Sequence, residues 1–296
     1  MAHRIAEDGK LEDAGKLQLF IHTLFARSEP TILRILDRMM ESDLFRGRGR
    51  PILVFMRERL DFLPRGEVVS TQRAKDFLDA LSNSGDSKII VGPCVCQEAL
   101  GRREGTLIKE LTVLYGTEVY ERAKGDEGGI RVISPAEAKG LLDRLREEGC
   151  IPTFYACLQS TGWMVVVCNC DGKVCLPKRA HQLLGGVLSP GPDIISLGAD
   201  GCIGCNRCVE RCSFGANRLF NGRVVFDPER CYGCGLCVST CPTKARRLVE
   251  RRGHAKLYYP IAFVAKYGSR AAGDGERPWR SWASDIGGPK IPSRQN

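Results

Sequence analysis

A repeated cysteine spacing constrains this chain more strongly than any other feature of its sequence. Two runs follow the pattern Cys-x2-Cys-x2-Cys-x3-Cys, with Cys202, Cys205, Cys208 and Cys212 in the first and Cys231, Cys234, Cys237 and Cys241 in the second. Their first cysteines are 29 residues apart, so the runs form an internal repeat. Three thiolates at two-residue gaps can surround one face of a cubane iron–sulfur cluster, while Gly204, Gly233 and Gly235 permit tight turns.

Paired zinc sites are the alternative interpretation, because four-cysteine zinc sites also use two-residue gaps. Such sites usually contain two cysteine pairs separated by a longer loop, whereas each run here has three cysteines in tandem followed by a fourth. The spacing therefore favours iron–sulfur clusters over zinc.

The double run resembles the bacterial-type ferredoxin domain, which carries two [4Fe-4S] clusters. The resemblance extends to Val209-Glu210, Ala216, Ala245 and the segment 227–230, although Ser213 stands where the family usually has proline. It implies that the fourth cysteine of each run ligates the cluster of the other run. One cluster would then be held by Cys202, Cys205, Cys208 and Cys241, and the other by Cys212, Cys231, Cys234 and Cys237.

The remaining sequence indicates a protein of a reducing compartment without a membrane span. The chain has 15 cysteines among 296 residues, starts without a secretory signal, and contains no apolar run of about 18 residues. We therefore expect a cytoplasmic protein whose thiols bind metal rather than form disulfides. The formal net charge of +9 is concentrated after residue 250, but this basic segment lacks the density typical of a nucleic-acid site.

Composition and periodicity divide the chain into four parts and predict an α+β protein. An N-terminal α/β domain covers 1–184, a Gly/Pro-rich linker 185–198, the ferredoxin domain 199–250, and a basic, largely disordered tail 251–296. Within the first domain we expect helices at 14–26 and 31–43 separated at Pro30, a helix at 71–82 capped by Ser70, and a capping box at Ser134.

Seven cysteines lie outside the ferredoxin domain, and five of them fall into two groups. Each group follows a run that is typical of a buried strand, so parallel neighbouring strands would bring both groups to one edge of a sheet. We predict a third metal site there, an iron–sulfur cluster ahead of zinc, with ordinary buried thiols as the alternative. Its candidate ligands are Cys94, Cys96, Cys168, Cys170 and Cys175; Cys150 is expected to be a simple buried residue, and Cys157 fits neither group.

The predicted function is single-electron transfer through two or three [4Fe-4S] clusters to a redox partner protein, alone or within a larger oxidoreductase complex. One alternative is an oxidoreductase that binds its substrate at a third cluster in the N-terminal domain. Another is a redox-sensing regulator that binds nucleic acid, which the charge pattern disfavours. No nucleotide-binding glycine motif or paired histidines occur, and Asp171 and His181 are expected to be solvated rather than a dyad, so no catalytic residue is predicted.

Overall fold

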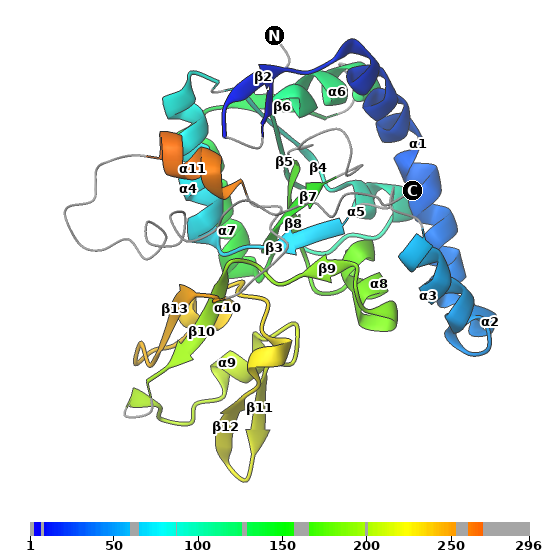
Figure 1. Ribbon diagram of the computed structural model, residues 1–296. Helices are drawn as coiled ribbons and strands as arrows, with labels where there is room; N and C mark the ends of the chain where they lie inside the picture. Colours follow the sequence, from blue (N-terminus) through cyan, green and yellow to red (C-terminus); the bar gives the residue numbers. More distant parts are fainter. Residues whose placement is uncertain are drawn as a thin grey trace, which may run out of the picture.

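The computed structural model describes residues 3–6, 9–59, 65–86, 88–125, 129–156, 166–198, 201–252 and 260–268. Its centre is a seven-stranded sheet with helices on both faces (Figure 1). All adjacent strands are antiparallel except β3 and β9, which are parallel. The strand order is β6 (Arg131–Ile133), β4 (Ile89–Pro93), β5 (Ile108–Val113), β8 (Val166–Cys170), β7 (Ile151–Ala156), β3 (Arg65–Val68) and β9 (Leu188–Ser189).

The helices form two layers because side chains along each strand alternate between the faces of the sheet. Phe154 of β7 packs into the core under one layer, whereas the adjacent Tyr155 packs on the opposite side. The first layer contains α4 (Thr71–Ser84), α7 (Pro135–Glu148) and α11 (Ile261–Tyr267). The second contains α1 (Lys16–Glu41), α5 (Val95–Leu100), α6 (Tyr115–Lys124) and α8 (Leu176–Leu184).

Three local predictions can be compared directly with these helices. The Ser70 side chain accepts a hydrogen bond from the Arg73 N–H at the start of α4, and the Ser134 capping box starts α7, so both predictions are confirmed. The predicted break at Pro30 is wrong, because α1 continues through it. Proline removes one backbone donor from a helix and its ring crowds the carbonyl four residues earlier, but α1 packs against both α5 and α6.

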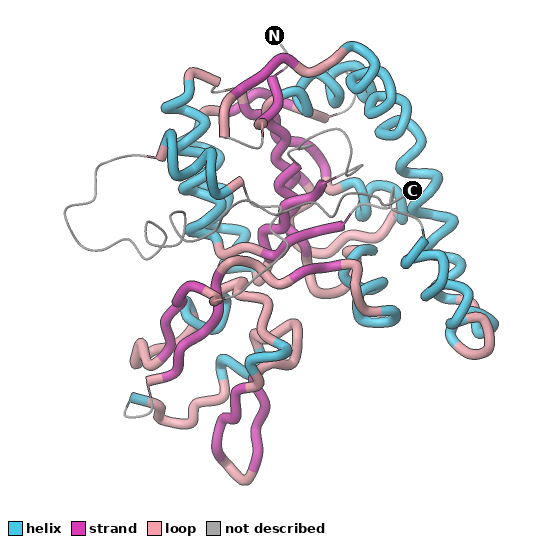
Figure 2. The backbone as a smooth tube through the Cα atoms, viewed as in Figure 1, coloured by secondary structure: helices cyan, strands magenta, loops and turns pink. Residues whose placement is uncertain are grey.

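Short elements surround this layered domain. The hairpin of β1 (His3–Ile5) and β2 (Leu11–Asp13) lies near the start of α1, and α2 (Asp43–Arg46) and α3 (Arg50–Arg59) follow its end. Figure 2 shows the magenta strands of the large sheet between layers of cyan helices. The described helices include none with the length and apolar character needed to cross a bilayer.

The cysteine repeats belong to a second unit beyond one end of the large sheet (Figure 1). Its strands form two antiparallel pairs, and one short helix follows the first cysteines of each run. These elements are β10 (Asp193–Leu197) with β13 (Arg246–Glu250), β11 (Asn217–Phe220) with β12 (Arg223–Phe226), α9 (Arg207–Glu210), the 3-10 turn Pro228–Arg230, and α10 (Leu236–Ser239). Together with the layered domain they confirm the predicted α+β class.

Two segments predicted from composition contribute regular structure. Residues 185–198, expected to be a linker, contain β9 of the large sheet and β10 of the second unit. In the segment 251–296, expected to be a tail, α11 packs against α4, with Phe263 fully buried. Residues 269–296 lie outside the described residues. The chain thus passes from the large sheet to the cysteine repeats and back to the first domain.

Candidate metal centres

The two cysteine runs fold in the same way, as their sequence repeat predicts. A residue in the left-handed region, Asn206 (φ 61°) or Gly235 (φ 78°), precedes each short helix, α9 or α10. Four residues beyond the last cysteine of each run lies a buried alanine. The backbone N–H of Ala216 donates to Cys212 Sγ at 3.2 Å, and that of Ala245 donates to the Cys241 sulfur. Each fourth cysteine therefore already accepts an amide hydrogen bond, as cluster thiolates commonly do.

Cysteines from both runs line one cavity at the far side of this unit. They are the first three cysteines of the first run and the last of the second: Cys202, Cys205, Cys208 and Cys241. Cys202 and Cys205 are exposed, whereas Cys208 is buried. We call these four residues the outer quartet. Burial raises the pKa of Cys208. Burial alone would also raise that of Cys241, but donors from Thr243, Ala245 and Arg246 lower it.

The other four cysteines lie close together on the side of the unit nearer the large sheet. Cys234 and Cys237 each have Cys212 and Cys231 among their electrostatic neighbours. Cys231 and Cys237 are buried, and burial raises the pKa of Cys234 to about 12 and of Cys237 to about 11. We call Cys212, Cys231, Cys234 and Cys237 the inner quartet. The structure therefore brings together the same two sets of four that the ferredoxin resemblance implies.

A buried cation lies between the two quartets. Arg246 is 3% exposed, its guanidinium donates to Asn217 Oδ1 at 2.6 Å, and its charge lowers the pKa of both Cys208 and Cys237. Thiolates that hold a cluster are negative, so a buried positive charge beside both sets favours them. Sequence reasoning missed Arg246, since nothing distinguishes it from its neighbour Arg247, which is exposed.

Comparison with known families identifies this unit. Residues 201–245 match the 4Fe-4S dicluster domain. The segment is a two-cluster ferredoxin-type domain. The match includes all eight cysteines of the two quartets, and it shows iron–sulfur electron transfer as the general function of this part of the chain. None of the curated proteins that were searched matches the chain.

The dicluster domain packs tightly on the layered domain through its inner quartet. Val68, Ile151 and Leu188 of the large sheet form one apolar cluster with Leu236 of α10, and Cys234 packs against it. Asp193 of β10 pairs with Arg73 of α4 at 2.7 Å. Arg211 donates to the carbonyls of Arg146 and Glu147, at the negative end of α7. Apolar, ionic and hydrogen-bonded contacts therefore fix the inner quartet against the first domain.

The five candidate ligands of the layered domain lie near the ends of two interior strands of its sheet, β4 and β8. Strands β4 and β8 are both antiparallel to β5, so they run in the same direction with one strand between them. Cys94 follows β4 as the N-cap of α5, and Cys96 lies in the first turn of that helix. Cys168 and Cys170 lie on one face of β8, and Cys175 is the N-cap of α8.

These five cysteines, which we call the N-terminal thiol group, lie close enough to influence one another's pKa. Cys96 is hydrogen-bonded to both Cys94 and Cys175, and Cys175 is also hydrogen-bonded to Cys170. Cys168 has Cys170, Cys94 and Cys96 among its electrostatic neighbours. Hydrogen bonds from Cys175 lower the pKa of Cys96 and of Cys170, whereas burial raises that of Cys168.

Polar residues surround the N-terminal thiol group. The Tyr155 hydroxyl lies 3.6 Å from Cys170 Sγ, and Cys168 Sγ donates to Glu110 at 3.7 Å. Burial raises the pKa of Glu110 well above its ordinary value. Beside the group, Lys109 and Asp171 form an ion pair at 3.1 Å, although Asp171 was expected to be solvated. Sequence reasoning missed Tyr155, Lys109 and Glu110, because only the fold brings them to the cysteines.

Cys150 and Cys157 belong neither to a quartet nor to the N-terminal thiol group. Cys150 is buried between α7 and β7, with Lys109 Nζ at 3.9 Å from its sulfur, and burial raises its pKa to about 11. Cys170 is among its electrostatic neighbours, but Cys150 comes from the β7 side of the sheet and is not one of the five candidate ligands. Cys157 lies outside the described residues.

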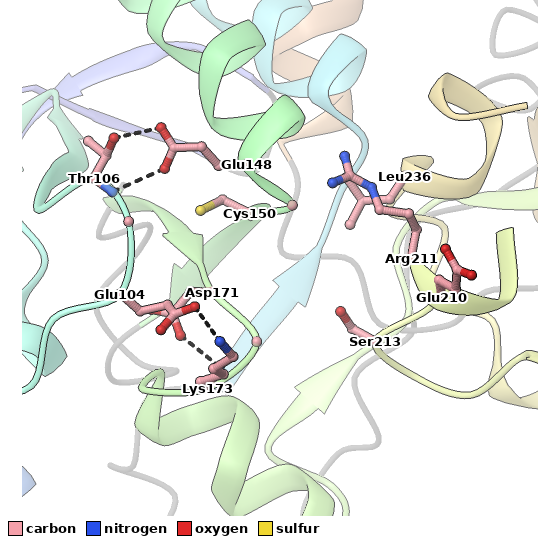
Figure 3. Close-up of a pocket in the computed structure, with 13 residues that line it drawn as sticks. Glu104, Thr106, Glu148, Cys150, Asp171, Lys173, Glu210, Arg211, Ser213 and Leu236 are labelled. Atoms are coloured by element: carbon pink, nitrogen blue, oxygen red, sulfur yellow. Dashed lines mark hydrogen bonds and ion pairs between the residues drawn. The ribbon is translucent and has the colours of Figure 1, made fainter. Parts of the chain in front are cut away.

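A cavity of about 590 Å³ opens between the two domains (Figure 3). Cys150, Asp171 and Lys173 line it from the layered domain, and Arg211 and Ser213 from the dicluster domain. Two of the lining residues are sequence neighbours of metal-site candidates, since Asp171 follows Cys170 and Ser213 follows Cys212. The cavity therefore lies next to both the inner quartet and the N-terminal thiol group.

Proposed function

We propose that this protein carries single electrons between a redox partner and its own layered domain, through two [4Fe-4S] clusters held by the outer and inner quartets. The observation that carries the proposal is the difference in exposure between the quartets. Two cysteines of the outer quartet are exposed, whereas the inner quartet is packed against the layered domain. A partner protein can approach the first, whereas the second adjoins the layered domain and the interdomain cavity.

The residues present fit such clusters. Each quartet supplies four thiols from both runs, as two-cluster domains of this spacing require. Backbone amides donate to Cys212 and Cys241, and Arg246 places a positive charge beside both sets. Hydrogen bonds and positive charge stabilise the more negative, reduced form of a cluster. Each bound cluster supplies one-electron redox chemistry, and the chain supplies ligands, charge and insulation.

Ligand replacement in the full-length protein tests the two quartets separately. Cys202→Ser/Cys205→Ser should remove about four iron atoms and four acid-labile sulfides per chain, and so should Cys231→Ser/Cys237→Ser. The matched control is Cys150→Ser, which removes a buried thiol outside both quartets. Anaerobic metal and sulfide analysis, together with electron paramagnetic resonance (EPR) of the dithionite-reduced protein, gives the readout.

Two results would overturn the proposal. Anaerobically purified protein without acid-labile sulfide would exclude iron–sulfur clusters at both quartets. Equal loss of both EPR signals on replacing either quartet, with native helicity retained, would show that the assignment of ligands to two separate clusters is wrong.

The interdomain cavity favours a second candidate function, in which the layered domain reduces a small substrate with electrons from the dicluster domain. The cavity adjoins the inner quartet and is lined by charged and polar groups, which suits a small polar molecule. Ser213→Trp would narrow it while leaving all eight quartet cysteines in place. Slower reoxidation of the reduced variant by small polar oxidants would support this function, and unchanged rates would dismiss it.

A further inference from the structure

We propose that the N-terminal thiol group holds a third iron–sulfur cluster, placed to exchange electrons with the cluster of the inner quartet. The metal site stands on the geometry of the layered domain alone, while its role in electron exchange rests on the function proposed above. The candidate ligands are Cys94, Cys96, Cys168, Cys170 and Cys175.

Five free thiols from separate elements converge in the layered domain. The cysteines come from the β4–α5 junction, from β8 and from the N-cap of α8, yet Cys170, Cys175 and Cys168 share one buried apolar cluster. Cys96 interacts electrostatically with Cys94 and with Cys175. All five are free cysteines. Cys170 and Cys175 are buried, and the other three are half-buried. Four thiolates are enough to hold one cubane cluster.

The backbone around the group is arranged for sulfur ligands, which is the second argument. The Gln97 N–H donates to the Cys94 sulfur, and the Leu176 N–H, in the first turn of α8, donates to the Cys96 sulfur. Helix α8 has nine residues, so its positive end lies beside the thiols and favours thiolates there. Amide donors of this kind also occur on the fourth cysteines of both dicluster quartets.

The spacing of the thiols bears on the kind of metal. Within the described residues, no three Cys, His, Asp or Glu side chains are gathered as a single metal ion requires. A four-iron cluster is larger than one ion and binds each thiolate through a different iron atom. Four thiolates around a cubane therefore lie farther apart than four around one ion, and metal analysis distinguishes the two.

Shared packing with the inner quartet is the argument for electron exchange. Cys170 and Cys175 belong to the same buried apolar cluster as Leu236 of α10, and Cys168 and Cys234 both pack against it. Phe214 stacks on Tyr232 in that cluster, with ring centroids 4.1 Å apart. Side chains of one apolar cluster thus connect a cysteine of the inner quartet with three N-terminal thiols.

Metal analysis of the full-length, anaerobically reconstituted protein tests the site. The wild type should contain about twelve iron atoms and twelve acid-labile sulfides, and Cys96→Ser/Cys170→Ser about eight of each. Cys150→Ser, a matched change at a buried cysteine outside the group, should keep about twelve. Retained EPR signals of both dicluster quartets would show that the double variant is folded.

Three outcomes would overturn the inference while leaving the dicluster proposal intact. In the first, the wild-type protein contains only about eight iron atoms per chain. In the second, Cys96→Ser/Cys170→Ser contains as much iron as the wild type. In the third, the double variant has lost zinc relative to the wild type, and no iron or sulfide. Failure of the dicluster proposal looks different, because iron content would then be unaffected by changes to either quartet. If the double variant does not fold, spin counting on the reduced wild type decides between two centres and three.

Electron exchange has its own readout. A reduced third centre close to the inner quartet should broaden the EPR signal of the inner cluster through magnetic coupling, and Cys96→Ser/Cys170→Ser should sharpen that signal. The outer signal serves as the internal control and should change less. Identical inner-cluster line widths in wild type and variant would exclude a paramagnetic centre beside it.

Discussion

Lys109 and Asp171 show how one buried residue depends on a distant partner. Both side chains are almost fully buried and lie 3.1 Å apart. Asp171 also accepts hydrogen bonds from the backbone N–H groups of residues 173–175. Burial alone would raise the pKa of Asp171, but these donors and Lys109 lower it to about 2. From its position in a Gly-containing loop, Asp171 was expected to be exposed to solvent. Its partner Lys109 lies 62 residues earlier in the chain, so the sequence contained no sign of the pair.

Removing one charge of this pair should destabilise the fold strongly. We expect Asp171→Asn to lower the free energy of unfolding by about 3 kcal/mol, because it leaves the Lys109 ammonium buried without a counter-charge. Chemical denaturation followed by circular dichroism measures the change. The double variant Lys109→Met/Asp171→Asn should be more stable than Asp171→Asn alone, and equal stability of the two would contradict the explanation.

Glu148 offers a titration test at the rim of the interdomain cavity. The Thr106 hydroxyl donates to Glu148 at 2.7 Å, and this bond is the largest cause of its lowered pKa. Thr106→Val should raise that pKa toward the ordinary value for glutamate, as measured by carboxyl carbon NMR, whereas Thr106→Ser should leave it lowered.

The sign of the linked effect on stability follows from the direction of that shift. A carboxyl whose pKa is lowered on folding stabilises the protein above its unfolded pKa, and loses this contribution as pH falls through the folded pKa. Thr106→Val should therefore lower the free energy of unfolding at neutral pH and change it little under strongly acidic conditions. An equal effect at both pH values would indicate lost packing instead.

At the scale of single elements, local signals were sufficient where one segment determines its own structure. Ser70 and Ser134 predict their helices because the cap and the N–H that it accepts lie within one turn. Pro30 misled the prediction because contacts of α1 with other helices outweigh one missing hydrogen bond. The two quartets were predictable from spacing and resemblance, whereas Arg246 was not, since its burial depends on how β13 packs between them.

Gly233 tests how closely an inner-quartet loop approaches β10. It has φ +74°, and a Cβ built there would lie 2.1 Å from the Asp193 carbonyl oxygen. Gly222 has the same φ of +74° but no atom within 4 Å of such a Cβ. Both alanine variants incur a backbone cost of about 1 kcal/mol, but only Gly233→Ala also forces the loop away from β10.

We therefore expect Gly233→Ala to lower the melting temperature more than Gly222→Ala and to reduce the inner-cluster EPR signal. Gly222→Ala should retain both signals at full intensity. Equal melting temperatures for the two variants would show that the close approach does not contribute to the stability of the junction.

At the scale of the whole molecule, the two quartets differ in what surrounds them. In Figure 1 the β11–β12 hairpin extends away from the layered domain, while α10 lies against it. The sequence indicated a ferredoxin-type unit after an α/β region, but nothing in it indicated this orientation. The interdomain contacts, such as Arg73 with Asp193 and Arg211 with α7, join residues that carry no pairing signal in the sequence.

This orientation predicts how reductants reach the protein. Removing the outer cluster by Cys202→Ser/Cys205→Ser should slow reduction of the inner cluster by a protein electron donor at least tenfold, since the donor can no longer approach a centre closely. Reduction by the small molecule dithionite should change much less. Stopped-flow absorbance measures both rates, and equal slowing by the two reductants would contradict an outer entry point.

The return of the chain to its first domain has a consequence for biosynthesis. Phe263 of α11 is fully buried beside Phe77 of α4, with ring centroids 6.0 Å apart, yet it follows the dicluster domain in sequence. On the ribosome, the dicluster cysteines emerge before the hydrophobic core of the N-terminal half can close over α4. Metal delivery to the nascent chain thus has a window in which that half is still incompletely folded.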